Sequence, residues 1–335
     1  MSMQPNVTNR VTSFAYRAAA IALVATVAAC ADDASPTRPM EPAPASAAKN
    51  GGGSSQRILF AGDLDEVGNY DIYSMNPDGT GIQRLTNSPA FDGDPVFSPD
   101  GKRIAFTSMR DRIGGDTYVM NADGTNVVRL TFGPGAVRTP SWSKDGKQLV
   151  VSSTRDAADP DAANLVDYEV YVMNADGSAI KRLTDNTYMD DQATWSPDGR
   201  QIAFISGRDH VGTSGNDLYV MNVDGTNVTR VTEQPGGLLL PSWDPHSRRI
   251  AFSLDDDGPN AGIYFVSLDS QGQTRVTTHT LSLDNGPSWS PDGTKLAYSC
   301  EVGGPLQVCV VNADGTGRVQ LTTGTRSHSE VRWSR

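Results

Sequence analysis

The sequence predicts an all-β fold, a closed six-bladed β-propeller of four-stranded antiparallel blades, because one structural unit recurs along most of the chain. An aromatic residue followed by a tight-turn sequence opens each unit, as in Trp195-Ser196-Pro197-Asp198-Gly199. The six aromatic residues are separated by 45, 53, 48, 46 and 44 residues, close to the length of a propeller blade. They are Phe97, Trp142, Trp195, Trp243, Trp289 and Trp333.

Each unit also carries the signals of three further strands. An alternating apolar segment such as Ile202–Ile205 follows the tight turn and is typical of a half-buried strand. A third strand such as Tyr219–Met221 ends in Asn-Ala-Asp-Gly or a near variant, and a short fourth strand ends in Arg-Leu-Thr or Arg-Val-Thr. Proline and glycine suit these turns, since Pro presets φ and Gly supplies a positive φ.

The two ends of the repeat region indicate how the ring closes. The repeats begin in mid-unit, with Ile58–Phe60 as a second strand and no aromatic first strand before it. The missing first strand is the one left over at the other end, around Val331–Ser334. We expect this C-terminal strand to pair with the N-terminal strands and to close a propeller over residues 57–335, because closure removes exposed sheet edges.

Composition and charge exclude several classes of protein. The 335 residues include 28 Lys and Arg against 39 Asp and Glu, which gives a formal charge of −11. This excess of acidic residues does not provide the positive charge that binds a phosphate backbone, so we expect no nucleic-acid partner. The many β-branched and aromatic residues exclude wholesale disorder. We expect a monomer.

The N-terminal residues 1–29 have the pattern of a lipoprotein signal peptide. Arg10 and Arg17 precede a small, apolar run, Ala18–Ala29, which is too short to span a bilayer of about 30 Å. The run ends in Val27-Ala28-Ala29-Cys30, which resembles a bacterial lipobox and makes Cys30 the expected lipid-attachment site. The alternative is an ordinary signal peptide with a cysteine nearby.

Residues 30–56 are expected to form the lipid anchor and a flexible linker, because they are rich in Ala, Pro, Ser and Gly. The protein is then exported and anchored in a membrane, at the periplasmic face or in the outer membrane of a bacterium.

The repeated unit resembles a known family. The sequences WSPDG, IAF, YVMNADG and RLT are similar to the WD40-like propeller repeats of the TolB family, and they cover essentially all of residues 57–335. The resemblance implies a six-bladed propeller and, by analogy with the soluble periplasmic TolB proteins of the Tol–Pal system, an envelope role. Those proteins carry an α/β domain before the propeller, whereas only the linker precedes the blades here. The related oligopeptidases carry a Gly-x-Ser-x-Gly motif, which this sequence lacks.

A ligand site is predicted at the mouth of the axial channel, five residues before each aromatic position. In ring order these positions hold Asp92, Val137, Asp190, Leu238, Asp284 and His328. Three carboxylates and one imidazole that converge near the axis could hold a divalent cation or a cationic group of a ligand. In the alternative, each Asp caps its own turn or bonds the backbone of a neighbouring blade. No other cofactor is expected.

Two further features lie in the last blades. Cys300 and Cys309 flank a short loop between two strands, and in an exported protein we expect them to form a disulfide. The run from Gly236 to Leu240 is apolar and is expected to be exposed on the face with the longer loops, where it would favour protein contact.

These features favour a non-enzymatic envelope lipoprotein that acts as a binding or scaffold module for a protein, a peptide or an envelope polymer. The alternative is an axial-site enzyme, a polysaccharide lyase or hydrolase that could depend on a metal. No set of residues supplies a nucleophile, a base and an oxyanion stabiliser together, so no catalytic residue is assigned.

Overall fold

The computed structural model describes residues 56–335, apart from residues 66, 159, 161–167, 211–214, 234–236, 256–259, 271, 279–283, 302 and 335. The predicted signal peptide, Cys30 and linker residues 31–55 lie outside the described residues. No helix in the described part of the chain is long and apolar enough to cross a membrane.

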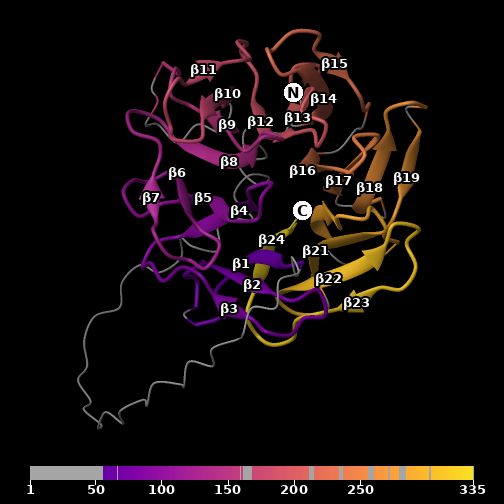
Figure 1. The fold of residues 1–335 in the computed structure, drawn as a ribbon. Helices are drawn as coiled ribbons and strands as arrows, with labels where there is room; N and C mark the ends of the chain where they lie inside the picture. The colour runs from indigo at the N-terminus through magenta and orange to yellow at the C-terminus, as the bar shows by residue number, and fades with distance from the viewer. Residues whose placement is uncertain are drawn as a thin grey trace, which may run out of the picture. The chain divides into compact units, whose positions relative to one another are not determined.

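The described strands form six four-stranded antiparallel sheets around one axis, which confirms the predicted six-bladed propeller (Figure 1). Blades 1 to 3 are β24 (His328–Trp333), β1 (Ile58–Gly62), β2 (Asp71–Met75) and β3 (Gln83–Arg84); β4 (Asp92–Phe97), β5 (Arg103–Ser108), β6 (Asp116–Asn121) and β7 (Val128–Arg129); and β8 (Val137–Trp142), β9 (Gln148–Ser153), β10 (Glu169–Asn174) and β11 (Lys181–Arg182). Blades 4 to 6 are β12 (Asp190–Trp195), β13 (Gln201–Ser206), β14 (Asp217–Asn222) and β15 (Thr229–Arg230); β16 (Gly237–Trp243), β17 (Arg249–Asp255), β18 (Gly262–Ser267) and β19 (Gln273–Arg275); and β20 (Asn285–Trp289), β21 (Lys295–Glu301), β22 (Leu306–Asn312) and β23 (Val319–Gln320).

Blade 1 is assembled from both ends of the propeller, as the sequence predicts. Strand β24 pairs antiparallel with β1, with Trp333 opposite Ile58 and His328 opposite Gly62. Beyond the strands, Arg57 N donates to Ser334 Oγ at 2.8 Å. Each sheet therefore has its first strand at the axis and its short fourth strand at the outer edge of the ring.

The hydrophobic core lies between neighbouring blades. One cluster joins Val150 and Val170 of blade 3 to Trp195 and Phe204 of blade 4, and all four side chains are buried. Clusters of the same kind lie at the other junctions between blades. The aromatic residue of each repeat is therefore a packing group that holds one blade against the next, since burial of large apolar side chains is the main favourable term in folding.

The tight turns are also fixed by contacts between blades. Gly177, in the turn between β10 and β11, has a φ of 85°. A Cβ at this position would lie 2.1 Å from the carbonyl oxygen of Leu130 in blade 2. Glycine is required here for both reasons, the positive φ and the close approach of the preceding blade.

A buried acid, an Arg and a Thr join the third and fourth strands of most blades, and we call this set the acid–Arg–Thr brace. In blade 2, Asp116 accepts hydrogen bonds from Thr131 Oγ1 at 2.8 Å and from Arg129 Nη2 at 2.7 Å. Thr131 Oγ1 in turn accepts from Thr117 N at 3.0 Å. Blades 1, 3 and 4 repeat the brace with Asp71, Arg84 and Thr86; Glu169, Arg182 and Thr184; and Asp217, Arg230 and Thr232.

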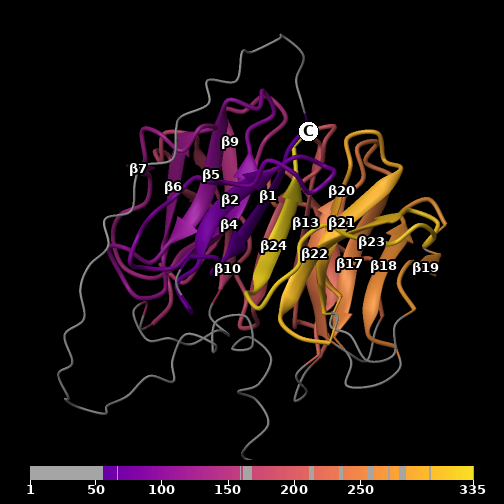
Figure 2. The ribbon, with the colours of Figure 1, turned by 90° about the horizontal axis from the view of Figure 1, so that it is seen from below.

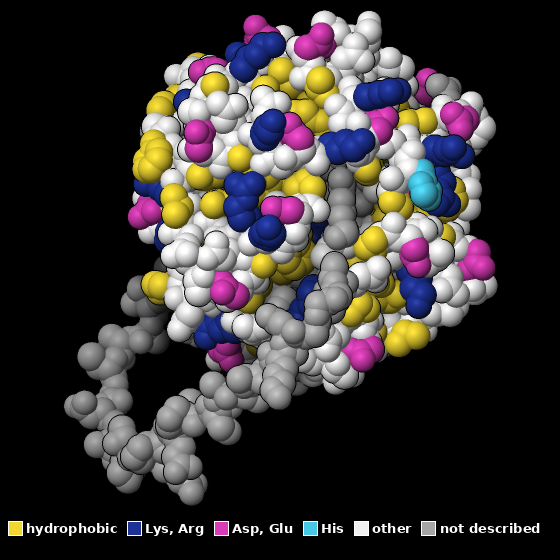
Figure 3. All heavy atoms as spheres, in the orientation of Figure 1, with side chains coloured by type: hydrophobic (Ala, Val, Ile, Leu, Met, Phe, Trp, Pro, Cys, Tyr) yellow, Lys and Arg dark blue, Asp and Glu magenta, His cyan; other side chains and the backbone are white. Residues whose placement is uncertain are grey.

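The blades present two different faces. Loops from first to second and from third to fourth strands are short and emerge on one side, which we call the tight-turn face. The remaining loops emerge on the opposite side, which we call the loop face (Figure 2). The tight-turn face, turned towards the viewer in Figure 3, carries charges of both signs interspersed with apolar side chains. Both ends of the propeller, Arg57 and Ser334, meet on this face.

Candidate axial site

Asp92 and Asp190 are buried inside their own blades. Asp92 accepts from Arg110 Nη2 at 2.8 Å, and Asp190 accepts from Arg208 Nη2 at 2.7 Å. Asp190 also accepts from Ser206 Oγ at 2.5 Å. Each Asp thus ties the start of the first strand to the end of the second, a contact within one blade that was not among the expected partners. Burial raises the pKa of Asp92 despite its Arg partner.

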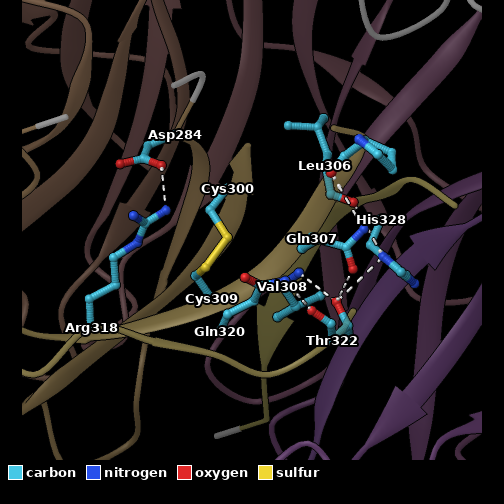
Figure 4. Close-up of a disulfide and its surroundings, with 11 residues drawn as sticks. Asp284, Cys300, Leu306, Gln307, Val308, Cys309, Arg318, Gln320, Thr322 and His328 are labelled. Carbon is cyan, nitrogen blue, oxygen red and sulfur yellow. Dashed lines mark hydrogen bonds and ion pairs between the residues drawn. A yellow bond between two sulfur atoms is a disulfide. The ribbon is translucent and has the colours of Figure 1, made fainter. Parts of the chain in front are cut away.

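Asp284 and His328 also have separate partners (Figure 4). Asp284 lies 3.7 Å from Arg318 Nη2. His328 is buried edge-on against Phe60, and its Nδ1 lies 3.3 Å from the carbonyl oxygen of Leu306. Burial lowers the pKa of this imidazole, which favours its neutral form.

The four predicted side chains are not brought together as one group. No cluster of three or more His, Cys, Asp or Glu side chains that could hold a metal ion occurs among the described residues. Cation binding by Asp92, Asp190, Asp284 and His328 stays a prediction. For an ion to bind at the first two, Arg110 and Arg208 would have to leave their carboxylates.

Cys300 and Cys309 are joined in a disulfide between β21 and β22 (Figure 4). Both residues are fully buried, and their Cα atoms lie 5.8 Å apart. The disulfide packs in the core between blades 5 and 6, so it is placed to stabilise the fold.

The apolar run near Leu240 is not an exposed patch, which corrects the expectation from the sequence. Residues 234–236 lie outside the described residues, and Gly237–Trp243 form β16, the axial strand of blade 5. Leu238 is fully buried, and Leu240 faces the axis. Leu238 packs in the core and Leu240 lines the axial cavity, so these residues do not form a surface for protein contact.

Of the residues two positions after the predicted ones, Asp94, Thr139, Gln192 and Leu240 line a cavity on the axis. Each first strand contains an irregularity at this point, and the residue there has a positive φ. These residues are Asp94, Thr139, Gln192, Leu240, Gly286 and Glu330, with φ between 50° and 65°. For a non-glycine residue this conformation costs about 1–3 kcal/mol, so the surrounding structure must hold it in place.

Side chains from the ring itself satisfy the backbone at these positions. Glu330 Oε2 accepts from Asp94 N at 2.5 Å, across the junction between blades 1 and 2. Gln192 Oε1 accepts from Leu240 N at 2.5 Å, across the junction between blades 4 and 5. A Cβ at Gly93 would lie 2.5 Å from Glu330 Oε2, so a larger residue there would displace the Glu330 carboxyl.

A small cavity of about 80 Å³ lies on the axis beside these residues. One ring of its lining comes from the residue before each aromatic position: Val96, Ser141, Thr194, Ser242, Ser288 and Arg332. Five of these side chains are small, and Arg332 is the single charged member. The indole rings of Trp243, Trp289 and Trp333 also contribute to the wall.

Charged side chains gather on one side of the axis. Arg138 pairs with Asp191 of the next blade and stacks over Tyr168, with 3.8 Å between the guanidinium carbon and the ring centre. Burial and the neighbouring Asp94 carboxylate raise the pKa of Glu330 to about 8. Glu330 is therefore mostly protonated at neutral pH. Burial also raises the pKa of Asp94.

The Glu330 carboxyl predicts a distinct dependence of stability on pH. Because its pKa is higher in the folded state than in the unfolded chain, the folded state binds more protons between about pH 4.5 and pH 8, and stability falls as the pH rises through this window. Asp94, Arg138, Asp191 and Arg332 share this environment. In Glu330→Gln the loss of unfolding free energy between pH 5 and pH 9 should be smaller by about 4 kcal/mol. Urea unfolding of both proteins across this range measures it, and parallel curves would contradict the assignment.

Comparison with known proteins places this architecture in a class. Residues 56–169 match the family model of the Tricorn protease N-terminal beta propeller domain, and residues 213–335 match that of the TolB beta propeller domain. The structure, with six four-stranded blades around an axial cavity, is that of a six-bladed propeller, the class of protein that both family models describe. The propeller part of the chain is thus similar to TolB-like propeller repeats.

Individual relatives agree with this assignment. A TolB homolog of Chlorobium chlorochromatii is 28% identical over 152 residues, which are 45% of this chain and 31% of the relative. An uncharacterized protein of Agrobacterium fabrum is 30% identical over 241 residues, 72% of this chain and 50% of the relative. The match therefore spans half or less of the length of these curated relatives. The crystal structure of TolB from Acinetobacter baumannii superposes with a TM-score of 0.72 at 22% identity, covering 84% of this chain and 67% of that one, and shows the shared fold.

Proposed function

We propose that the protein is an exported envelope lipoprotein, anchored through Cys30, whose propeller is a non-enzymatic binding or scaffold module for a protein, a peptide or an envelope polymer. The similarity of the propeller to TolB-like repeats supports an envelope role. Residues 1–29 would act as the signal peptide and residues 30–56 as the anchor and linker. Arg57, the first residue of the predicted propeller region, lies on the tight-turn face beside Ser334.

The observation that carries the proposal is a set of three exposed apolar side chains in loops of the loop face in blades 1 and 2. Ile113 is 96% exposed, Val67 is 77% exposed and Phe132 is 66% exposed. We call these three residues the loop-face patch. Large apolar side chains exposed in loops are typical of contact sites, and aromatic residues often dominate the binding energy of such sites.

The loops that carry the patch are held in place by specific contacts. Arg112 Nη1 donates to the carbonyl oxygens of Gly133 and Gly135, and the second bond is 2.8 Å long. This joins the loop that contains Ile113 to the loop that contains Phe132. Arg129 stacks over the Phe132 ring, with 4.9 Å between the guanidinium carbon and the ring centre. A surface that is ordered before binding loses less conformational entropy when the partner binds.

Affinity capture from native envelopes tests this function. We expect the wild-type protein to retain a defined set of envelope components. The double variant Ile113→Ser, Phe132→Ser should recover at least tenfold less of them, because truncating each central apolar contact costs about 2 kcal/mol or more. The matched control is Val319→Ser, which removes an apolar side chain that is 54% exposed on the outer strand β23. Equal recovery by all three proteins would reject the loop face as the binding surface.

The enzymatic alternative would place its chemistry at the axis. Asp94 lines the axial cavity and Glu330 accepts from its backbone N, and a polysaccharide lyase or hydrolase would need such acid–base groups. Pockets that hold small-molecule ligands commonly measure about 300–1,000 Å³. The cavity of about 80 Å³ is small for a sugar or a peptide, so the binding function is supported better.

A further inference from the structure

The axial cavity has one positive charge for which the protein provides no close counter-ion. Arg332 Nη1 donates to the carbonyl oxygen of Val331 at 3.0 Å, and no carboxylate of the described residues lies within ion-pair distance of its guanidinium. The other charged Arg at the axis, Arg138, is already paired with Asp191. A guanidinium presents five donors in a planar fork, so most of the donors of Arg332 remain for other acceptors.

The wall around Arg332 offers further donors of the right kind. Ser288 Oγ accepts from Trp333 N at 2.9 Å, and Ser141 Oγ accepts from Trp195 N at 3.1 Å. Ser141 Oγ also lies 3.4 Å from Thr194 Oγ1. The Ser288 hydroxyl accepts with its oxygen, which leaves its O–H proton to be directed elsewhere. A buried cation beside a hydroxyl donor favours a ligand that brings a negative charge and acceptor oxygens.

Size and charge narrow the class of ligand. The cavity of about 80 Å³ is much smaller than common ligand pockets of about 300–1,000 Å³, which suits an ion of three to five heavy atoms. Asp94 and Glu330 lie near enough to act on Arg332, and burial lowers the pKa of the Arg332 guanidinium. An anion with a charge of −2 would be repelled by Asp94, whereas a singly charged one meets less repulsion.

We propose that the axial cavity is a binding site for a small monocarboxylate, of the size of formate or acetate, which Arg332 holds through its guanidinium fork with hydrogen bonds from the hydroxyls around it. The site lies on the axis and uses none of the residues of the loop-face patch. It therefore goes beyond the proposed binding function and does not rest on it.

Titration of the mature protein tests the site in solution. Sodium acetate is added at constant ionic strength at pH 6.5, with sodium chloride as the reference, while tryptophan fluorescence is followed, since three indoles line the cavity. We expect a saturable change for acetate and formate that chloride does not produce, and at least tenfold weaker binding in Arg332→Gln. The matched control, Arg200→Gln on an exposed tight turn, should bind as wild type does. A response to acetate no different from that to chloride would overturn the proposal, and so would phosphate binding more tightly than acetate.

A second measurement does not depend on whether the Arg332 variant folds. Crystals of the wild-type protein are soaked in bromoacetate, and the bromine is located by its anomalous scattering. We expect a peak in the axial cavity with the carboxylate at Arg332. An axial cavity without bromine, when the soak is strong enough to label other sites, would reject the proposal whatever the solution titration shows.

Discussion

Val331→Asp is expected to leave no folded propeller at 25 °C. Val331 is fully buried in β24, within the cluster that includes Ile58 and Phe60 of its own blade and Val308 of blade 6. A carboxylate at this position has no partner, and burying an unpaired charge costs several kcal/mol. The change also weakens the one strand that closes the ring, so the loss should approach the total stability of a domain, about 5–15 kcal/mol.

Circular dichroism and thermal unfolding measure this effect against a matched control. Val319→Asp places the same charge on the outer strand β23, where the side chain is 54% exposed, and should change stability by less than about 0.5 kcal/mol. A Val331→Asp protein that unfolds cooperatively near the wild-type temperature would show that the ring does not depend on β24.

Asp116→Ala should destabilise the protein by about 3–5 kcal/mol, because it breaks a buried ion pair from one side. Arg129 loses its closest charged partner and keeps only a longer contact with Asp111 at 3.8 Å, and Thr131 loses the acceptor for its hydroxyl proton. The variant therefore leaves a weakly compensated positive charge and an unpaired hydroxyl at the edge of the core, which is less stable than removing the whole set.

The chain itself contains a neutral version of the brace that supplies the control. In blade 6, Gln307 Oε1 accepts from Thr322 Oγ1 at 3.0 Å, and Gln320 Nε2 donates to the carbonyl oxygen of Thr322 at 2.7 Å. The double variant Asp116→Gln, Arg129→Gln copies this arrangement into blade 2. We expect it to recover at least half of the stability that Asp116→Ala loses, as measured by urea unfolding. If the double variant were less stable than Asp116→Ala, the charge of the pair itself would be the stabilising element.

The fold was predictable because its signals are local and repeat. The aromatic residue and tight turn at Trp195, and the equivalent turns in other blades, each specify a strand end without reference to the rest of the chain. Closure through β24 followed from the unit left incomplete at each end. Repetition makes such predictions strong, since an error in one unit is corrected by the others.

The sequence did not predict which side chains line the axial cavity, and the reason is physical. The prediction assumed that Asp92 and Asp190 would face the channel at the start of the first strand. Instead, each carboxylate forms an ion pair within its own blade, with Arg110 and Arg208 respectively. An irregularity after them turns the next residues, such as Asp94, towards the axis. Strict alternation along a strand does not anticipate such a bulge.

Exposure of the loop-face patch was also beyond sequence reasoning. Ile113 and Phe132 are isolated apolar residues in polar loops, and isolated residues of this kind carry no periodic signal. Arg112 brings their loops together through contacts with the backbone, which depend on the folded chain. Leu240 shows the opposite case, an apolar run that was expected outside and lines the axis.

Site-directed photo-crosslinking in the native envelope tests most directly that the loop face is the binding surface. A benzophenone amino acid at position 113 replaces a side chain that is 96% exposed, so the fold tolerates it, and the same group at position 319 on β23 is the control. The proposed function predicts one discrete cross-linked product from position 113 and none from position 319. Adducts from position 319 with none from position 113 would contradict it.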